Sequence, residues 1–83
     1  MKAYLDTTIL TLLLFGQSHH PQRHAEVKAF FEALDAGRLQ AVVSIYALQE
    51  LCAYCHANFP SGHAPVVTRL AFHEALGHKV LVV

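Results

Sequence analysis

The feature that most constrains this fold is a set of three short apolar runs with the character of buried strands. They are Ala3–Leu5, Leu39–Val43 and Lys79–Val83. The last run contains the uninterrupted apolar segment Val80–Val83, a pattern typical of strands that are buried on both faces of a parallel sheet. Helical sequence separates the runs, and strands joined by helical crossovers form a parallel sheet with helices on its faces. We therefore predict an α/β fold.

Two helical segments are expected between each pair of strands. Asp6, Thr7 or Thr8 is a suitable N-cap for the first helix, which ends near Gly16. The second helix begins with Pro21 at its first position and is closed by Gly37. Ser44 can cap the third, and the fourth stops at Gly77. The predicted first, third and fourth helices span 9–15, 45–57 and 65–76, which makes the element order βααβααβ.

The composition places the chain among small globular domains. It has 83 residues, of which 54% are hydrophobic and 14% charged, and this balance is opposite to that of disordered proteins. No linker or repeat divides the sequence, so we expect a single domain over residues 1–83. The formal net charge of zero gives no indication of a nucleic-acid binder, but it does not exclude one, since a small catalytic cleft needs only a local site.

Neither a membrane span nor a secretory leader is predicted. The longest apolar stretch, Ile9–Phe15, is far shorter than the roughly 20 residues of a membrane-spanning helix. Asp6 occupies the place of the basic region that begins a signal peptide, and no typical cleavage site follows. We expect a cytoplasmic protein with no membrane partner.

Two acidic residues are isolated within apolar sequence. Asp6 is the only charged residue between positions 3 and 22, and Glu50 is the only one between positions 39 and 68, with histidine counted as neutral. Asp6 follows the first strand, and Glu50 lies in the helix after the second strand. If these strands are neighbours, both carboxylates lie at one edge of the sheet, where a divalent cation such as Mg²⁺ would relieve their repulsion.

Each acidic residue also has a structural interpretation. Asp6 can act as an ordinary helix N-cap. Glu50 can be a solvated helix position, since it lies almost opposite the apolar stripe that we predict for the third helix. That stripe consists of Ile45, Leu48, Cys52 and Cys55.

The segments Tyr4–Leu10 and Val43–Leu51 resemble the first two motifs of the PIN-domain nucleases. The first is a strand that ends in Asp and is followed by Thr residues and an apolar helix; the second is a strand, a Ser and a helix that carries a Glu. The resemblance implies a three-layer α/β/α fold and an endoribonuclease that depends on Mg²⁺ or Mn²⁺ and cleaves RNA. It implies that Asp6 and Glu50 are catalytic residues and metal ligands. Thr7, Thr8 and Ser44 are the implied site neighbours, with Thr8 favoured over Thr7.

Many small prokaryotic members of that family are VapC-type toxins held inactive by an antitoxin, so the resemblance also implies an antitoxin-like protein partner. The family's remaining acidic residues follow the third strand, and this sequence ends there. We therefore expect this 83-residue chain to cleave RNA weakly or not at all. The alternative is a catalytically silent module that forms homo-oligomers or binds a partner, and the open edge expected on an unfinished sheet predicts such an oligomer.

Two further metal-binding interpretations are open. Cys52–His56 satisfies the C-x-x-C-H pattern of c-type haem attachment. The predicted α/β fold instead places both cysteines in the core as free, buried thiols. His19 and His20, with His24 four residues after His20, offer imidazoles for Ni²⁺ or Zn²⁺ near a helix start. Exposed histidines without a metal explain the same pattern.

Overall fold

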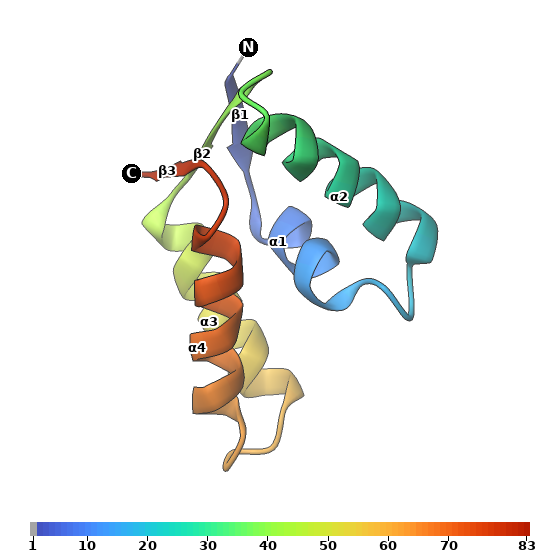
Figure 1. Cartoon of the computed structure of the whole chain (residues 1–83). Coiled ribbons are helices and arrows are strands. Elements are labelled where there is room, and N and C mark those ends of the chain that lie inside the picture. Colours follow the sequence, from blue (N-terminus) through green and yellow to red (C-terminus); the bar gives the residue numbers. More distant parts are fainter. Residues whose placement is uncertain (1) are drawn as a thin grey trace.

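The computed structural model describes residues 2–83, which form four helices and a three-stranded sheet (Figure 1). The order of elements confirms the predicted βααβααβ arrangement. The elements are β1 (Lys2–Leu5), α1 (Thr7–Phe15), α2 (Pro21–Asp35), β2 (Gln40–Val43), α3 (Ile45–Asn58), α4 (Ala64–Leu76) and β3 (Val80–Val82). Within the described residues, none of the helices is long and apolar enough to cross a membrane.

The sheet is parallel and has the strand order β1-β2-β3. Leu5 pairs with Val43, and Val43 pairs with Val82, so the carboxyl ends of all three strands lie at the same edge. The last residue extends this pairing, because the Val83 amide donates to the Val43 carbonyl over 2.9 Å. As β1 and β2 are neighbours, the helices that follow them, α1 and α3, begin side by side.

The helices share one hydrophobic core with the sheet. In Figure 1, α1 lies between α2 and the antiparallel pair formed by α3 and α4, and α1 packs against all three of these helices. The largest fully buried side chains come from all of these layers except α4: Phe31, Leu10, Leu34, Leu51, Val43 and Cys55. The α4 helix contributes small residues, among them Ala71 and Ala75, which allow close approach to its neighbours.

The end of α2 is set by local sequence. The Gly37 amide donates to Leu34 and the Arg38 amide to Ala33, each over 3.0 Å, and these two hydrogen bonds form a Schellman motif. Gly37 has a φ of +81°, a left-handed conformation that a residue with a Cβ adopts only with strain. The predicted closure of this helix by Gly37 is therefore confirmed.

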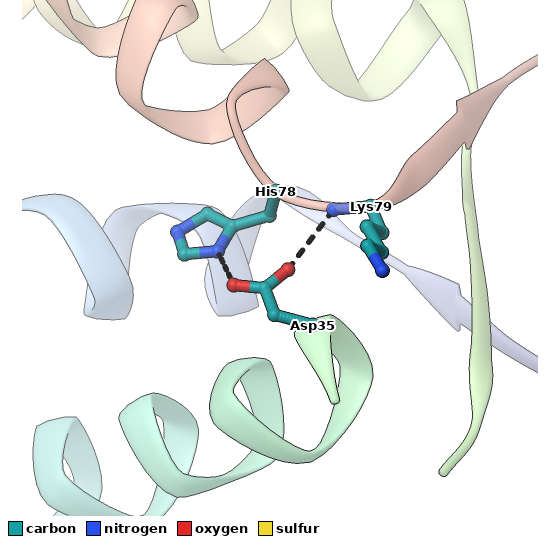
Figure 2. A network of polar contacts seen from close by, with 3 residues as sticks. All are labelled: Asp35, His78 and Lys79. Carbon is teal, nitrogen blue, oxygen red and sulfur yellow. Dashed lines mark hydrogen bonds and ion pairs between the residues drawn. The ribbon is translucent and has the colours of Figure 1, made fainter. Parts of the chain in front are cut away.

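A polar contact joins the end of α2 to the start of β3 (Figure 2). One carboxylate oxygen of Asp35 lies 2.7 Å from Nδ1 of His78, and the other accepts the Lys79 amide over 3.1 Å. The imidazole also packs against Phe31, with ring centroids 4.7 Å apart. These hydrogen bonds hold the pKa of Asp35 below its usual value. The contact links segments that are 43 residues apart in the chain.

The predicted apolar stripe of α3 is partly wrong. Ile45 is 54% exposed, whereas Leu51, which the stripe omitted, is completely buried. The buried positions of α3 are Ala47, Leu48, Leu51 and Cys55. The physical reason is that α3 packs against both α1 and α4, so its buried face is centred between the two contacts.

Candidate functional site

The two isolated carboxylates line one open pocket at the carboxyl ends of β1 and β2. The pocket has a volume of about 300 Å³ and is hereafter called the carboxylate pocket. Its lining comes from the end of β1, the first turn of α1 and the first two turns of α3: Leu5, Asp6, Thr7, Thr8, Ser44, Ala47 and Glu50. The two isolated acidic residues, Asp6 and Glu50, and the three neighbours that the resemblance implies, Thr7, Thr8 and Ser44, therefore lie around the same space.

Asp6 reaches this pocket as the N-cap of α1. Its Oδ1 accepts the backbone N–H of Ile9 over 3.0 Å, which satisfies one of the amides left free at the start of the helix. The structural interpretation of Asp6 is thus correct, yet it leaves a second function open. Among the hydrogen bonds of the described residues, none uses the Oδ2 atom of Asp6.

The starts of α1 and α3 are joined through Ala47. Ser44 caps α3 by accepting the Ala47 amide over 3.1 Å, and the hydroxyl of Thr7 donates to the Ala47 carbonyl over 3.4 Å. Ala47 was not recognised as part of the site from the sequence. The sequence feature that could have indicated it is its position three residues after Ser44, where the backbone amide donates to the capping side chain. The segments that carry Asp6 and Glu50 are therefore linked directly at this edge of the sheet.

Glu50 lies one turn beyond this junction on α3 and is exposed. The structural interpretation of a solvated helix position therefore agrees with its exposure. Asp6 and Glu50 are the two acidic residues in the lining of the pocket, and no basic residue lines it. Two carboxylates without a lining cation attract a positively charged ligand.

The helix ends around the pocket favour a negatively charged ligand group, whereas the two carboxylates favour a cation. Both α1 and α3 begin at its rim, and the amino-terminal end of a helix carries a partial positive charge. Because a hydrated divalent cation binds carboxylates and phosphates together, the pocket can hold a cation next to an anionic group near the helix ends.

The donor set fits a hard divalent cation. Two carboxylates and the hydroxyls of Thr7, Thr8 and Ser44 offer only oxygen atoms, which Mg²⁺ and Mn²⁺ prefer, and Mg²⁺ commonly keeps several waters. Residues 2–83 contain no group of three or more His, Cys, Asp and Glu side chains arranged to hold a metal ion. A cation in this pocket would therefore have at most two carboxylate ligands among the described residues, and we expect weak binding.

The structure does not favour haem attachment at the C-x-x-C-H segment. Both cysteines are free, but Cys55 is completely buried in the core and Cys52 is only half-buried. Burial raises the pKa of the Cys55 thiol, which keeps it protonated and unreactive. Covalent haem attachment needs access to both thiols.

The amino-terminal histidines have different surroundings. His19 and His20 are exposed, whereas His24 is half-buried and its Nδ1 lies 2.8 Å from the Leu12 carbonyl. Since a carbonyl only accepts hydrogen bonds, Nδ1 of His24 is the donor. This contact connects the first turn of α2 to α1, a structural role that the sequence did not indicate.

Comparisons of this chain with protein-family models, with curated proteins and with solved structures found no match. The fold and the site therefore stand on the residues and contacts described above.

Proposed function

We propose that the carboxylate pocket is the divalent-metal site of a PIN-like endoribonuclease. In this proposal Asp6 and Glu50 are metal ligands and catalytic residues, and Thr7, Thr8 and Ser44 are their neighbours. The observation that carries the proposal is the shared pocket: two acidic residues 44 positions apart line one space at the carboxyl ends of adjacent parallel strands. Ligands of open α/β sheets bind at this edge.

The residues of the pocket have distinct tasks in such a reaction. A bound Mg²⁺ or Mn²⁺ would activate water and neutralise charge on the scissile phosphate. The carboxylates of Asp6 and Glu50 would hold the cation. The capping hydrogen bond fixes the orientation of Asp6, so this ligand does not have to be ordered when the cation binds. The exposed hydroxyl of Thr8 can hold a water molecule or a phosphate oxygen.

The finer assignments belong to the same proposal. A three-layer α/β/α arrangement, a cytoplasmic location and an antitoxin-like protein that blocks the pocket are all properties that the resemblance implies. The α/β fold with its parallel sheet is compatible with the layered arrangement, whereas the cytoplasmic location and the protein partner rest on the sequence and the resemblance alone. The metal site is the part of the proposal that the pocket residues carry, so the first experiment addresses that site.

Mn²⁺ binding to the full chain tests the proposal. Paramagnetic broadening in NMR spectra should affect the amides of the carboxylate pocket first. Asp6→Asn keeps the capping oxygen but removes the charge, and Glu50→Gln removes the other carboxylate. We expect each variant to weaken Mn²⁺ binding at least tenfold, whereas Glu74→Gln, on the exposed surface of α4, should leave it unchanged. Broadening elsewhere, or broadening that both pocket variants retain, would contradict the proposal.

RNA cleavage is the second measurement. With only two carboxylates among the pocket residues, we expect little or no cleavage of single-stranded RNA in the presence of Mg²⁺ or Mn²⁺. Rapid metal-dependent cleavage that Asp6→Asn abolishes would support the function and refute the expected weakness. Cleavage that persists in Asp6→Asn or in the absence of divalent metal would exclude this site.

A catalytically silent binding module is the second candidate. In the described residues β1 and β3 are the outer strands of the sheet, and each has a free edge. Large apolar side chains on or next to these strands are exposed, among them Tyr4 at 79%, Leu81 at 61% and Val83 at 62%. Such surfaces favour association with another chain. This candidate predicts association without specific Mn²⁺ binding in the pocket.

A further inference from the structure

Two further pockets continue from the carboxylate pocket along α1. The first, of about 270 Å³, shares Thr8 with the carboxylate pocket. The second, of about 530 Å³, shares Phe15, His19 and Tyr54 with the first. We call these two pockets together the α1 groove. Because neighbouring pockets share lining residues, the carboxylate pocket and the α1 groove adjoin one another along α1, where α2 and α3 also contribute lining.

The α1 groove differs in charge from the carboxylate pocket. Its lining includes Arg23, His19 and His20, and it contains no Asp or Glu. Among residues 2–83 the one ion pair joins His78 to Asp35, so the guanidinium of Arg23 is not neutralised by an acidic side chain of the described chain. The hydroxyls of Thr8 and Tyr54 add hydrogen-bond donors, whereas the hydroxyl of Thr11 donates to the Thr8 carbonyl over 3.0 Å. The groove is therefore suited to an anionic ligand.

The groove also presents aromatic surface. Tyr54 is half-buried and stacks on Phe15, with ring centroids 5.6 Å apart and planes inclined by 24°. Because Tyr54 follows Glu50 by four residues on α3, it lies one turn further along the same face. Asn58, four residues later, lines the far pocket. With a rise of about 1.5 Å per residue, Glu50 and Asn58 are separated by about 12 Å along the helix.

The position of Arg23 is stabilised by its neighbour. The hydrogen bond from His24 to the Leu12 carbonyl, 2.8 Å long, fixes the first turn of α2 against α1. Arg23 immediately precedes His24 on this turn, and Thr8 and Thr11 lie on the adjacent helix. The cation and the hydroxyls therefore belong to two elements whose relative placement is constrained.

We propose that the α1 groove binds a single-stranded RNA segment adjacent to the phosphate that is cleaved in the carboxylate pocket. Arg23 contacts a backbone phosphate, and Tyr54 supports a base by stacking. A cation next to an aromatic ring is the combination used to bind single-stranded nucleic acids. The choice of RNA rests on the proposed function, whereas the groove and its charge do not depend on it.

An acidic peptide is the other anionic ligand that a cationic groove attracts. RNA fits better for two reasons. The aromatic side chains give its bases a stacking surface that a chain of carboxylates does not use. The groove also adjoins the carboxylate pocket at Thr8, and a cation held in that pocket would suit a phosphodiester that extends from one pocket to the next.

The test is binding of a fluorescein-labelled single-stranded RNA decamer to the full chain, measured by anisotropy with EDTA present. Removal of divalent metal makes the measurement independent of the proposed metal site. We expect Arg23→Gln to reduce the dependence of log affinity on log salt concentration by about 0.7, the contribution of one phosphate contact to a single strand. Tyr54→Leu should weaken binding at least about fivefold, and Tyr54→Phe should retain most of the affinity.

Matched substitutions outside the groove provide the controls. Arg69→Gln removes an exposed arginine from α4, and Tyr46→Leu removes a tyrosine that is 72% exposed on α3. Neither should weaken binding as the groove variants do. Circular dichroism checks that each variant is folded, and because Arg23 is exposed, its variant remains informative if Tyr54→Leu unfolds.

Three results would overturn the proposal. They are the absence of RNA binding in EDTA, equal effects of the groove and control substitutions, and equally tight, Arg23-dependent binding of a poly-glutamate peptide. If instead the groove variants reduce RNA binding while Mn²⁺ does not bind at Asp6 and Glu50, the metal-dependent function fails and the RNA-binding groove stands.

Discussion

Asp6 carries two tasks that substitution can separate. As an N-cap it supports α1 through a hydrogen bond that any short side-chain acceptor can make, and as a proposed metal ligand it must carry a negative charge. Asp6→Ala removes both properties. Asp6→Asn and Asp6→Ser retain a capping oxygen without the charge. We therefore predict that the three variants lose metal binding alike but differ in stability.

The size of the stability difference follows from the cap geometry. The 3.0 Å hydrogen bond from the Ile9 amide to Oδ1 is the one side-chain cap of α1, and loss of such a cap costs about 1 kcal/mol. For a domain of this size, 1 kcal/mol corresponds to a decrease of about 4–8 °C in Tm. Asp6→Asn should remain close to wild type. Ser44→Ala, which removes the equivalent 3.1 Å cap of α3, should cost a similar amount and is the matched comparison.

Thermal and urea unfolding monitored by circular dichroism measure these differences, and Mn²⁺ titration of the same samples measures binding. Equal stability of Asp6→Ala and wild type would refute the capping argument. A large loss of stability in Asp6→Asn would show that the charge itself supports the fold. Retention of Mn²⁺ binding by all three variants would show that Asp6 is a cap and nothing more.

Three further predictions concern the rest of the molecule. Hydrogen bonds hold the pKa of Asp35 in the folded protein below its value in the unfolded chain. The ionised carboxylate therefore stabilises the fold at pH values above the unfolded pKa, and this stabilisation is lost as the pH falls through the folded pKa. Urea unfolding in the acid range should therefore show the stability advantage of wild type over Asp35→Asn disappearing as the pH falls. In the native protein a thiol reagent should modify half-buried Cys52 before buried Cys55, and in urea it should modify both cysteines at similar rates. Equal rates in the native protein would mean that the core around α3 opens readily. Sedimentation equilibrium should detect a homo-oligomer that Leu81→Lys weakens, since Leu81 is 61% exposed on an outer strand; a wild-type monomer at micromolar concentration would refute this.

Several parts of the fold were predictable because their causes are local. Asp6 and Ser44 each bond to an amide three residues later, and such caps can be recognised from residue type and position. Gly37 is specified by the left-handed backbone at the end of α2. The three strands follow from short apolar runs, and their parallel direction follows from the helices that connect them. These features establish the α/β order of elements without knowledge of the packing.

The buried faces of the helices were less predictable, because they depend on which neighbours each helix meets. The helical wheel of α3 placed Ile45 on the apolar side, yet this residue is exposed, while Leu51, which the predicted stripe omitted, is fully buried. Hydrophobic periodicity predicts a single buried face for each helix. The α3 helix packs against both α1 and α4, so its buried face differs from the one that periodicity predicts.

The sequence by itself determined which residues are able to perform the proposed chemistry, and the tertiary structure decided which of them meet. The isolation of Asp6 and Glu50 is visible along the chain, but their shared pocket depends on β1 and β2 being adjacent. The pocket that Arg23 and Tyr54 share, and the contact between Asp35 and His78, have no local signal at all. These residues come together because burial of the common core fixes how distant segments pack, which brings their polar groups to the same part of its surface.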